Sequence, residues 1–176
     1  MPRLLGLAAA FFLAGCAEPS FVVAPTAVEF ELSGRFAVSY RGEANSGNLA
    51  WRHGAEAEEM LITSPLGQGV ARISRTAREV VLTTPELREY RAVDAESLTE
   101  QVLGFRLPLA GLAHWVRARP GPGASKSRLD AEGRLAELEQ GGWKVQYLEY
   151  DQGKRPSRLR MTYPGVDLRL AITQWK

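Results

Sequence analysis

The strongest constraint on the fold of this chain is an alternation of apolar and polar residues in its last third. Trp143, Val145 and Tyr147 occupy every second position, and the same alternation runs through residues 158–163 and 166–173. A β-strand shows this pattern when one face packs against an apolar interior and the other face is polar. We therefore expect one-sided antiparallel strands that surround a common interior.

The first half of the chain carries the same signal in shorter segments. From Gly34 the period is two, so that Phe36, Val38 and Tyr40 share one face of an expected strand. Polar, turn-forming segments then alternate with apolar ones, which predicts an antiparallel meander. The segments concerned are the expected turns 41–47 and 53–59, the expected strands 49–51, 60–63, 70–73 and 80–83, and, later in the chain, a weak hairpin over 129–138 with Glu132-Gly133 in its turn.

Two short amphipathic helices are expected between the strands. Asp94 is suited to cap the first helix and Gly104 to end it, whereas Pro108 is suited to the first position of the second helix, which ends before Arg119. The sequence thus predicts a mainly β fold with inserted helices, an incomplete antiparallel β-barrel with a short-helix lid over a hydrophobic cavity. Residues 26–176 are expected to form this single domain.

The N-terminus has the features of a secretory signal that ends at a cysteine. Arg3 precedes an apolar run over residues 4–13, and Ala14 and Gly15 directly precede Cys16, the only cysteine of the chain. This order is typical of a signal peptide and resembles the lipobox of bacterial lipoproteins, in which the cysteine is lipidated. The run is about half as long as the ~20 residues of a membrane-spanning helix.

The domain boundaries at the N-terminus follow from this signal. Residues 1–15 are expected to be a cleaved signal peptide, and residues 16–25 a lipidated N-terminus and tether. The alternative is an ordinary cleaved signal, but a lone cysteine has no disulfide partner within the chain. Ala17 follows Cys16, and in the lipoproteins that the motif resembles an Asp at that place signals inner-membrane retention. The resemblance therefore implies the periplasmic face of the outer membrane.

The chain carries no recognisable catalytic constellation. His53 and His114 are expected to be surface or rim imidazoles, and no Gly-x-Ser-x-Gly segment occurs. Its 22 basic and 20 acidic residues are spread along the chain, which argues against nucleic-acid binding. We expect a binding protein with no metal, no cofactor and no enzymatic activity. Five carboxylates are expected to be solvated, in turns or near helix starts: Glu56, Glu58, Asp94, Glu96 and Glu100.

Two features indicate what such a protein binds. The turn Pro65-Leu66-Gly67 places an aliphatic side chain at its tip, where Leu66 either folds back onto the rim of the sheet or touches lipid. The inward-facing apolar residues either fill a core or surround a cavity that suits acyl chains. The candidate cavity residues are Phe36, Val38, Tyr40, Trp51, Leu98, Val102, Leu112, Trp115, Val116, Trp143, Val145, Tyr147 and Met161.

Several short segments, in this order and spacing, resemble the LolB family, the outer-membrane lipoprotein receptors of the Lol lipoprotein-sorting pathway. The likeness runs from the lipobox to the last residues and so covers nearly the whole chain. Ala118 departs from it, because a glycine is expected after the Trp-Val pair. The segments are Gly34-Arg35-Phe36-Ala37-Val38, Ser64-Pro65-Leu66-Gly67-Gln68, Leu107-Pro108-Leu109 with Trp115-Val116, Gly142-Trp143-Lys144-Val145-Gln146-Tyr147 and the closing Ile172-Thr173-Gln174-Trp175.

The resemblance implies a function in lipoprotein transport. LolB proteins accept acylated lipoproteins from the periplasmic carrier LolA and insert them into the phospholipid of the outer membrane, without a cofactor or nucleotide hydrolysis. It also implies that Leu66 lies on a protruding loop implicated in membrane insertion. We expect a monomer. The alternative is a lipid-anchored outer-membrane scaffold or assembly protein with a filled core.

Overall fold

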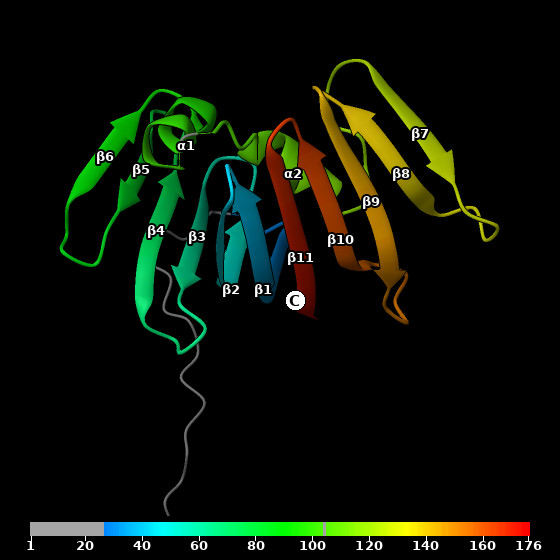
Figure 1. The fold of residues 1–176 in the computed structure, drawn as a ribbon, viewed down its shortest axis with the longest axis horizontal. Coiled ribbons are helices and arrows are strands. Elements are labelled where there is room, and N and C mark those ends of the chain that lie inside the picture. The colour runs from blue at the N-terminus through cyan, green and yellow to red at the C-terminus, as the bar shows by residue number, and fades with distance from the viewer. Residues whose placement is uncertain (1–26, 104) are drawn as a thin grey trace, which may run out of the picture.

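One antiparallel sheet makes up most of the structure, a computed structural model that describes residues 27–103 and 105–176. Its strands are β1 (Phe30–Tyr40), β2 (Glu43–His53), β3 (Glu58–Thr63), β4 (Gly69–Arg75), β5 (Val80–Thr83), β6 (Glu89–Ala92), β7 (Ser125–Leu129), β8 (Leu135–Gln140), β9 (Trp143–Tyr150), β10 (Pro156–Tyr163) and β11 (Val166–Trp175). Within the described residues these 11 strands lie in the order β6-β5-β4-β3-β2-β1-β11-β10-β9-β8-β7 (Figure 1).

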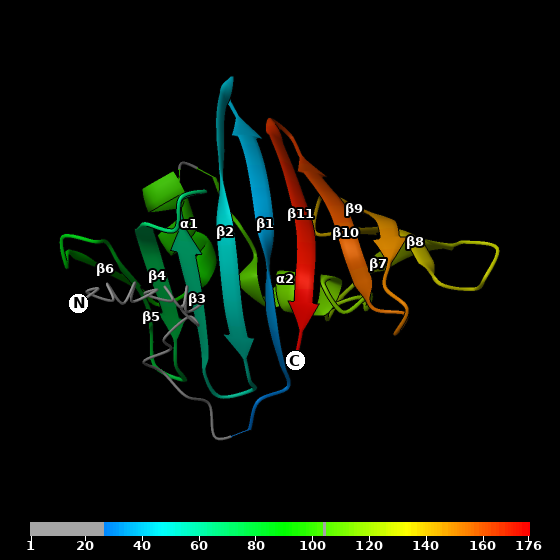
Figure 2. The same cartoon turned by 90° about the horizontal axis from the view of Figure 1, so that it is seen from below.

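The centre of the sheet joins two strands that are far apart in the chain. β1 pairs with its hairpin neighbour β2 and also with β11, where Phe36 lies opposite Leu170 and Val38 opposite Leu168. β6 and β7 form the two edges, so the curved sheet stays open (Figures 1 and 2). The predicted mainly β, antiparallel and incompletely closed fold is confirmed.

Both helices lie between β6 and β7 in the chain. They are α1 (Ala95–Leu103) and α2 (Leu109–Trp115), and they lie on one side of the sheet, behind it in Figure 2. Asp94 begins α1 as expected, because its Oδ1 accepts a hydrogen bond of 2.7 Å from the backbone N–H of Ser97. This bond satisfies one of the donors that a helix start leaves open.

The start of α2 differs from the expectation. Pro108 has φ −77° and ψ 87°, and this ψ lies outside the helical range, so Pro108 is the N-cap residue and Leu109 is the first helical residue. The predicted end of α2 before Arg119 is confirmed. The predicted end of α1 at Gly104 lies outside the described residues.

Two of the expected turns are too long. The turn expected over 41–47 ends at Gly42, because the β1–β2 hairpin extends past the core and its residues 43–46 are exposed on both faces, without alternation. The turn expected over 53–59 is also wrong, since only residues 54–57 connect β2 to β3. Glu58 and Glu59 are buried strand residues.

Two strands also differ from the expectation. β1 begins at Phe30, four residues before the expected start at Gly34, and β6 was not expected at all. β6 pairs with β5 over four residues, and two of its side chains, Glu89 and Arg91, are exposed, so its pattern is weak. The hairpin expected around Gly133 is confirmed, with a φ of +76° at that residue.

Candidate functional site

The loop between β3 and β4 holds Leu66 away from the protein. The N–H of Ser64 donates to the carbonyl of Gln68 (2.8 Å), and the N–H of Gly67 donates to the carbonyl of Ser64 (2.9 Å). Gly67 has a φ of +86°, a left-handed conformation that glycine adopts without steric cost. Leu66 is 90% exposed, so it does not fold back onto the rim of the sheet.

Most candidate cavity residues belong to one buried core. Phe36, Val38 and Tyr40 are only partly buried and pack against this core. The prediction for the side chain of Val102 lies outside the part of the chain that the structure describes, as does the prediction for Cys16. The buried candidates are Trp51, Leu98, Leu112, Trp115, Val116, Trp143, Val145, Tyr147 and Met161.

The second helix is fastened to the sheet by hydrogen bonds at Trp115. Its Nε1–H donates to Oε1 of Gln140 (2.9 Å), and the hydroxyl of Tyr147 donates to its carbonyl oxygen (2.9 Å). Gln140 also accepts from the N–H of Gly121 (2.8 Å) and donates to the Gly121 carbonyl (2.8 Å), which holds the chain after α2. Burial raises the pKa of Tyr147, so its hydroxyl remains a donor at neutral pH.

The helix is followed by a residue in a glycine-like conformation. Ala118 has a φ of +53°, in the left-handed region. The family resemblance predicts a glycine at this position, and the backbone has the geometry that glycine favours. Ala118 therefore carries a conformational cost that a glycine there would not have.

A buried polar cluster lies where the sequence indicated a solvated turn. Glu58 is 2% exposed, and its Oε2 accepts from Nε1 of Trp51 (3.1 Å) and contacts Nδ1 of His53 (2.6 Å). Its Oε1 accepts from Nε of Arg75 (2.6 Å). The expectations of a solvated Glu58 and a surface His53 are thus wrong, because β3 brings the carboxylate between β2 and β4, where three donors surround it.

The environment of Glu58 favours its charged form. Burial raises the pKa of its carboxyl, but the hydrogen bonds from His53 and Arg75, with their charges, outweigh burial and lower it overall. The ring of His53 stacks on Phe30, with 4.9 Å between ring centroids. The cluster therefore fixes three strands to one another at this end of the sheet.

His114, the other histidine expected at the surface or the rim, is partly buried on α2. Burial lowers the pKa of its imidazole, and the positive charge of Arg117 lowers it further. Over residues 27–103 and 105–176, no group of three or more His, Cys, Asp and Glu side chains could hold a metal ion. None of the helices in these ranges has the length and apolar character to cross a membrane.

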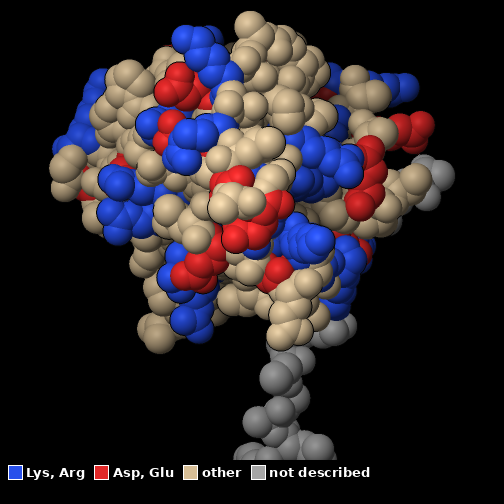
Figure 3. All heavy atoms as spheres, turned by 90° about the vertical axis from the view of Figure 1, so that its right-hand side faces the viewer, with Lys and Arg blue, Asp and Glu red and all other residues tan. Residues whose placement is uncertain are grey.

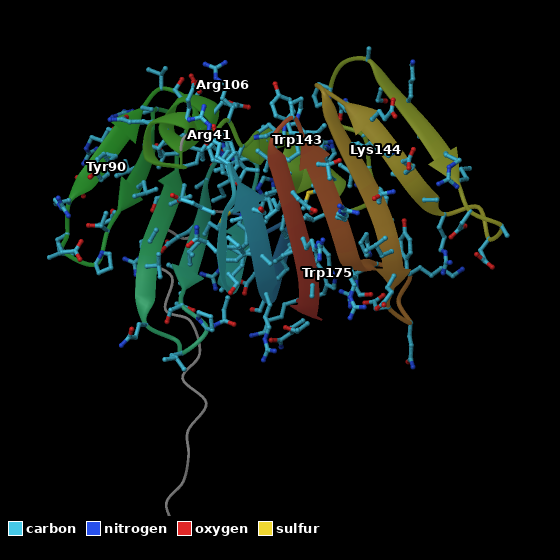
Figure 4. The ribbon with its side chains drawn as sticks, viewed as in Figure 1. Arg41, Tyr90, Arg106, Trp143, Lys144 and Trp175 are labelled. Atoms are coloured by element: carbon cyan, nitrogen blue, oxygen red, sulfur yellow. The ribbon has the colours of Figure 1, made fainter. Side chains whose placement is uncertain are left out.

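The outer surface of β7 to β10 carries charges of both signs. Figure 3 shows Lys and Arg interleaved with Asp and Glu on this side of the molecule. Trp143 and Lys144, labelled in Figure 4, are neighbours on β9 that belong to its two faces. Trp143 is buried, whereas Lys144 is partly exposed and pairs with Glu137 at 3.0 Å. Exposed ion pairs of this kind contribute little to stability.

Comparison with known proteins identifies the family. The family described as "Outer membrane lipoprotein LolB" matches residues 28–175, which is almost all of the described domain. The chain belongs to the LolB family. The resemblance inferred from the sequence is thereby confirmed, and with it a role in the Lol lipoprotein-sorting pathway and an outer-membrane location. LolB is not an enzyme family.

Relatives of this LolB family member match over most of their length. The outer-membrane lipoprotein LolB of Thiobacillus denitrificans is 39% identical over 183 residues, which cover 100% of this chain and 98% of the relative. The LolB of an Azoarcus species is 36% identical and is covered to 93%. The crystal structure of a LolA superfamily protein from Nitrosomonas europaea covers 87% of both chains with a TM-score of 0.52, and at 14% identity it shows similarity of fold alone.

Proposed function

We propose that this chain receives acylated lipoproteins from the periplasmic carrier LolA and inserts them into the outer membrane. The observation that carries the proposal is the 90% exposure of Leu66 at the tip of a closed hairpin turn. Burying a leucine side chain in an apolar phase is worth about 2 kcal/mol. Entry of the tip into a bilayer would release this free energy and bring the domain to the site of delivery.

The interior between the sheet and the helices is the proposed site for the acyl chains. Trp115 from α2 and Trp143, Val145 and Met161 from the sheet contribute apolar side chains to it. Acyl chains require apolar area rather than directional hydrogen bonds, and each methylene removed from water saves roughly 0.8 kcal/mol. Delivery requires that the interior hold the chains less strongly than the bilayer does.

Helix α1 is the element that we expect to move when acyl chains enter. α2 is fastened through Gln140 and Tyr147, whereas α1 packs mainly on β5 and β6 at the edge of the open sheet. Displacing α1 leaves both of these hydrogen bonds of α2 in place. In this proposal the interior opens on the side of the edge strands.

The proposed anchor is a diacylglycerol on Cys16 after removal of residues 1–15, with a further acyl chain on the new N-terminus. Stable anchoring takes about two chains, so three would hold the protein at the membrane. The proposal includes a monomer, because each step needs only one open interior and one exposed tip.

A transfer assay tests the proposal. The mature chain with Cys16→Ala is mixed with LolA that carries a triacylated lipoprotein, and the location of the cargo is measured before and after phospholipid vesicles are added. We expect the cargo to move from LolA to this chain and then to the vesicles. Cargo that stays on functional LolA, while the chain is folded, would favour a scaffold with a filled core.

The variant Leu66→Glu separates delivery from uptake. We expect it to fold and to accept cargo but to deliver it poorly, because a charged tip does not enter hydrocarbon. Leu148→Glu, which changes a leucine 54% exposed on β9, is the matched control and should deliver normally. Normal delivery by Leu66→Glu would contradict the role of the tip.

A further inference from the structure

A second hairpin loop repeats the turn that carries Leu66. In the loop between β5 and β6, the N–H of Thr84 donates to the carbonyl of Arg88 (2.9 Å), and the N–H of Leu87 donates to the carbonyl of Thr84 (2.9 Å). The β3–β4 loop has the same two bonds. In each loop the N–H of the first residue donates to the carbonyl of the fifth, and the N–H of the fourth residue donates to the carbonyl of the first. Each loop also has a proline in second place, Pro65 and Pro85.

The fourth residue of the second loop is unusual. Leu87 has a φ of +59°, and Gly67 occupies the equivalent left-handed position in the first loop. A leucine in this conformation costs roughly 1 kcal/mol or more relative to glycine. Leu87 is also 81% exposed, so burial against the protein does not offset this cost. Neither the turn nor the core accounts for a leucine at this position.

The two loops leave the sheet at the same end. β3, β4 and β5 are consecutive antiparallel neighbours, so β3 and β5 run in the same direction and their following loops emerge on the same side (Figure 1). Thr63 pairs with Gly69 at the base of the first loop, and Thr83 pairs with Glu89 at the base of the second. Leu66 and Leu87 are thus two aliphatic side chains exposed at one end of the molecule.

We propose that Leu87 is a second lipid-contacting residue, so that the domain meets the bilayer through two hairpin tips. This inference rests on the proposed function, in which Leu66 enters the same membrane. A lone aliphatic side chain on a polar tip suits a fluid hydrocarbon phase, which requires no preformed pocket on the partner. Glu86 and Arg88 flank Leu87 with opposite charges, with side chains 64% and 71% exposed, as suits a surface of zwitterionic headgroups.

Two contacts orient a rigid body in a way that one contact cannot. A domain held at Leu66 alone can tilt toward or away from β6, whereas a second contact at Leu87 fixes this tilt. Figure 4 places Tyr90 on β6, the strand that follows the second loop and against which α1 packs. The second tip would therefore fix the angle at which this edge of the open sheet stands on the bilayer, with α1 at the end of β6 away from the tip.

Depth-dependent quenching in vesicles tests the proposal. Cys16 is the only natural cysteine, so in the lipidated mature protein a Leu87→Cys variant offers one free thiol for a polarity-sensitive dye, and intact mass confirms a single label. The protein is reconstituted in vesicles of phosphatidylethanolamine and phosphatidylglycerol, with or without lipids that carry a quencher on the acyl chain. Leu66→Cys is the reference for the proposed function. Val93→Cys is the control, since Val93 is 89% exposed at the opposite end of β6.

The outcomes separate the inference from the proposed function. Quenching at positions 87 and 66, with none at 93, supports two tips in the bilayer. Quenching at 66 alone overturns the inference and leaves the proposed function in place, whereas quenching at neither position contradicts both. A dye at 87 that lipid does not quench but added LolA shields would assign Leu87 to a protein partner and also overturn the inference.

A variant of the turn gives an independent measurement. Leu87→Gly relieves the left-handed leucine, so we expect its melting temperature to be unchanged or higher. In the non-lipidated Cys16→Ala background, we expect its partition onto the same vesicles to fall roughly tenfold, the scale of burying one leucine side chain. Val93→Gly should partition like the parent. Equal partition of Leu87→Gly and the parent would refute the lipid contact.

Discussion

Replacing Glu58 by alanine tests the energetic importance of the buried polar cluster. The variant removes the acceptor of Trp51 Nε1 and Arg75 Nε and the partner of His53 Nδ1, at a position that is 2% exposed. Removing one partner of a buried ion pair costs about 3–5 kcal/mol, because the remaining groups stay buried without partners. For a chain of this size, each kcal/mol corresponds to about 2–4 °C. We therefore expect the melting temperature to fall by roughly 10 °C.

Urea unfolding followed by circular dichroism measures the loss in the free energy of unfolding without relying on the fluorescence of Trp51, and a thermal scan with the same signal gives the melting temperature. Glu58→Gln keeps the shape and one acceptor oxygen, and we expect it to lose less stability than Glu58→Ala. Glu149→Ala is the matched control, because Glu149 is 53% exposed and pairs with the exposed Arg158 at 2.7 Å. Its loss should stay below about 1 kcal/mol. If Glu58→Ala were no more destabilising than this control, our account of the cluster would be refuted.

Three further predictions concern the same fold. The pKa of Glu58 is lower in the folded than in the unfolded protein, so its ionised carboxylate stabilises the fold fully above the unfolded-state pKa, and this stabilisation is lost as pH falls through the folded-state pKa. The free energy of unfolding of the parent protein should therefore exceed that of Glu58→Gln by less at pH 3 than at pH 7, as urea titrations can measure. Gln140→Leu leaves Trp115 Nε1 and the Gly121 N–H without their acceptor and should cost about 1–3 kcal/mol in the same assay. Ala118→Gly should stabilise by roughly 0.5 kcal/mol, whereas Ala118→Val should destabilise, as differential scanning calorimetry can show.

Features that depend on local sequence were predictable. The alternation from Trp143 to Tyr147 gave the correct faces of β9, and Asp94 marked the start of α1, because a strand period and a helix cap are set by residues a few positions apart. The turn that carries Leu66 belongs to the same class, although the sequence left open whether the leucine folds back onto the rim, and only the structure shows it to be exposed. Its turn is closed within five residues, so proline and glycine spacing sufficed to place it.

Features that depend on distant partners were not predictable. Glu58 and His53 looked like turn residues, and only the pairing of β3 with β2 and β4 places Trp51 and Arg75 around the carboxylate. β6 was missed for a related reason, since an edge strand with half of its side chains exposed has little alternation. Leu87 was missed with it, because the second loop is recognisable only once both of its strands are known.

The pairing of β1 with β11 has a consequence for how the chain folds. β11, which follows every other described strand in chain order, becomes a central strand of the sheet, and its partner β1 lies over 100 residues earlier, with Leu32 opposite Trp175. Contacts between such distant segments form slowly, because a long loop must close first. The hairpins on either side can form early, but they are joined into one sheet only once β11 pairs with β1. A truncation after β10 would therefore divide the sheet at its middle instead of trimming an edge, and would leave two hydrophobic halves exposed to aggregation in the periplasm.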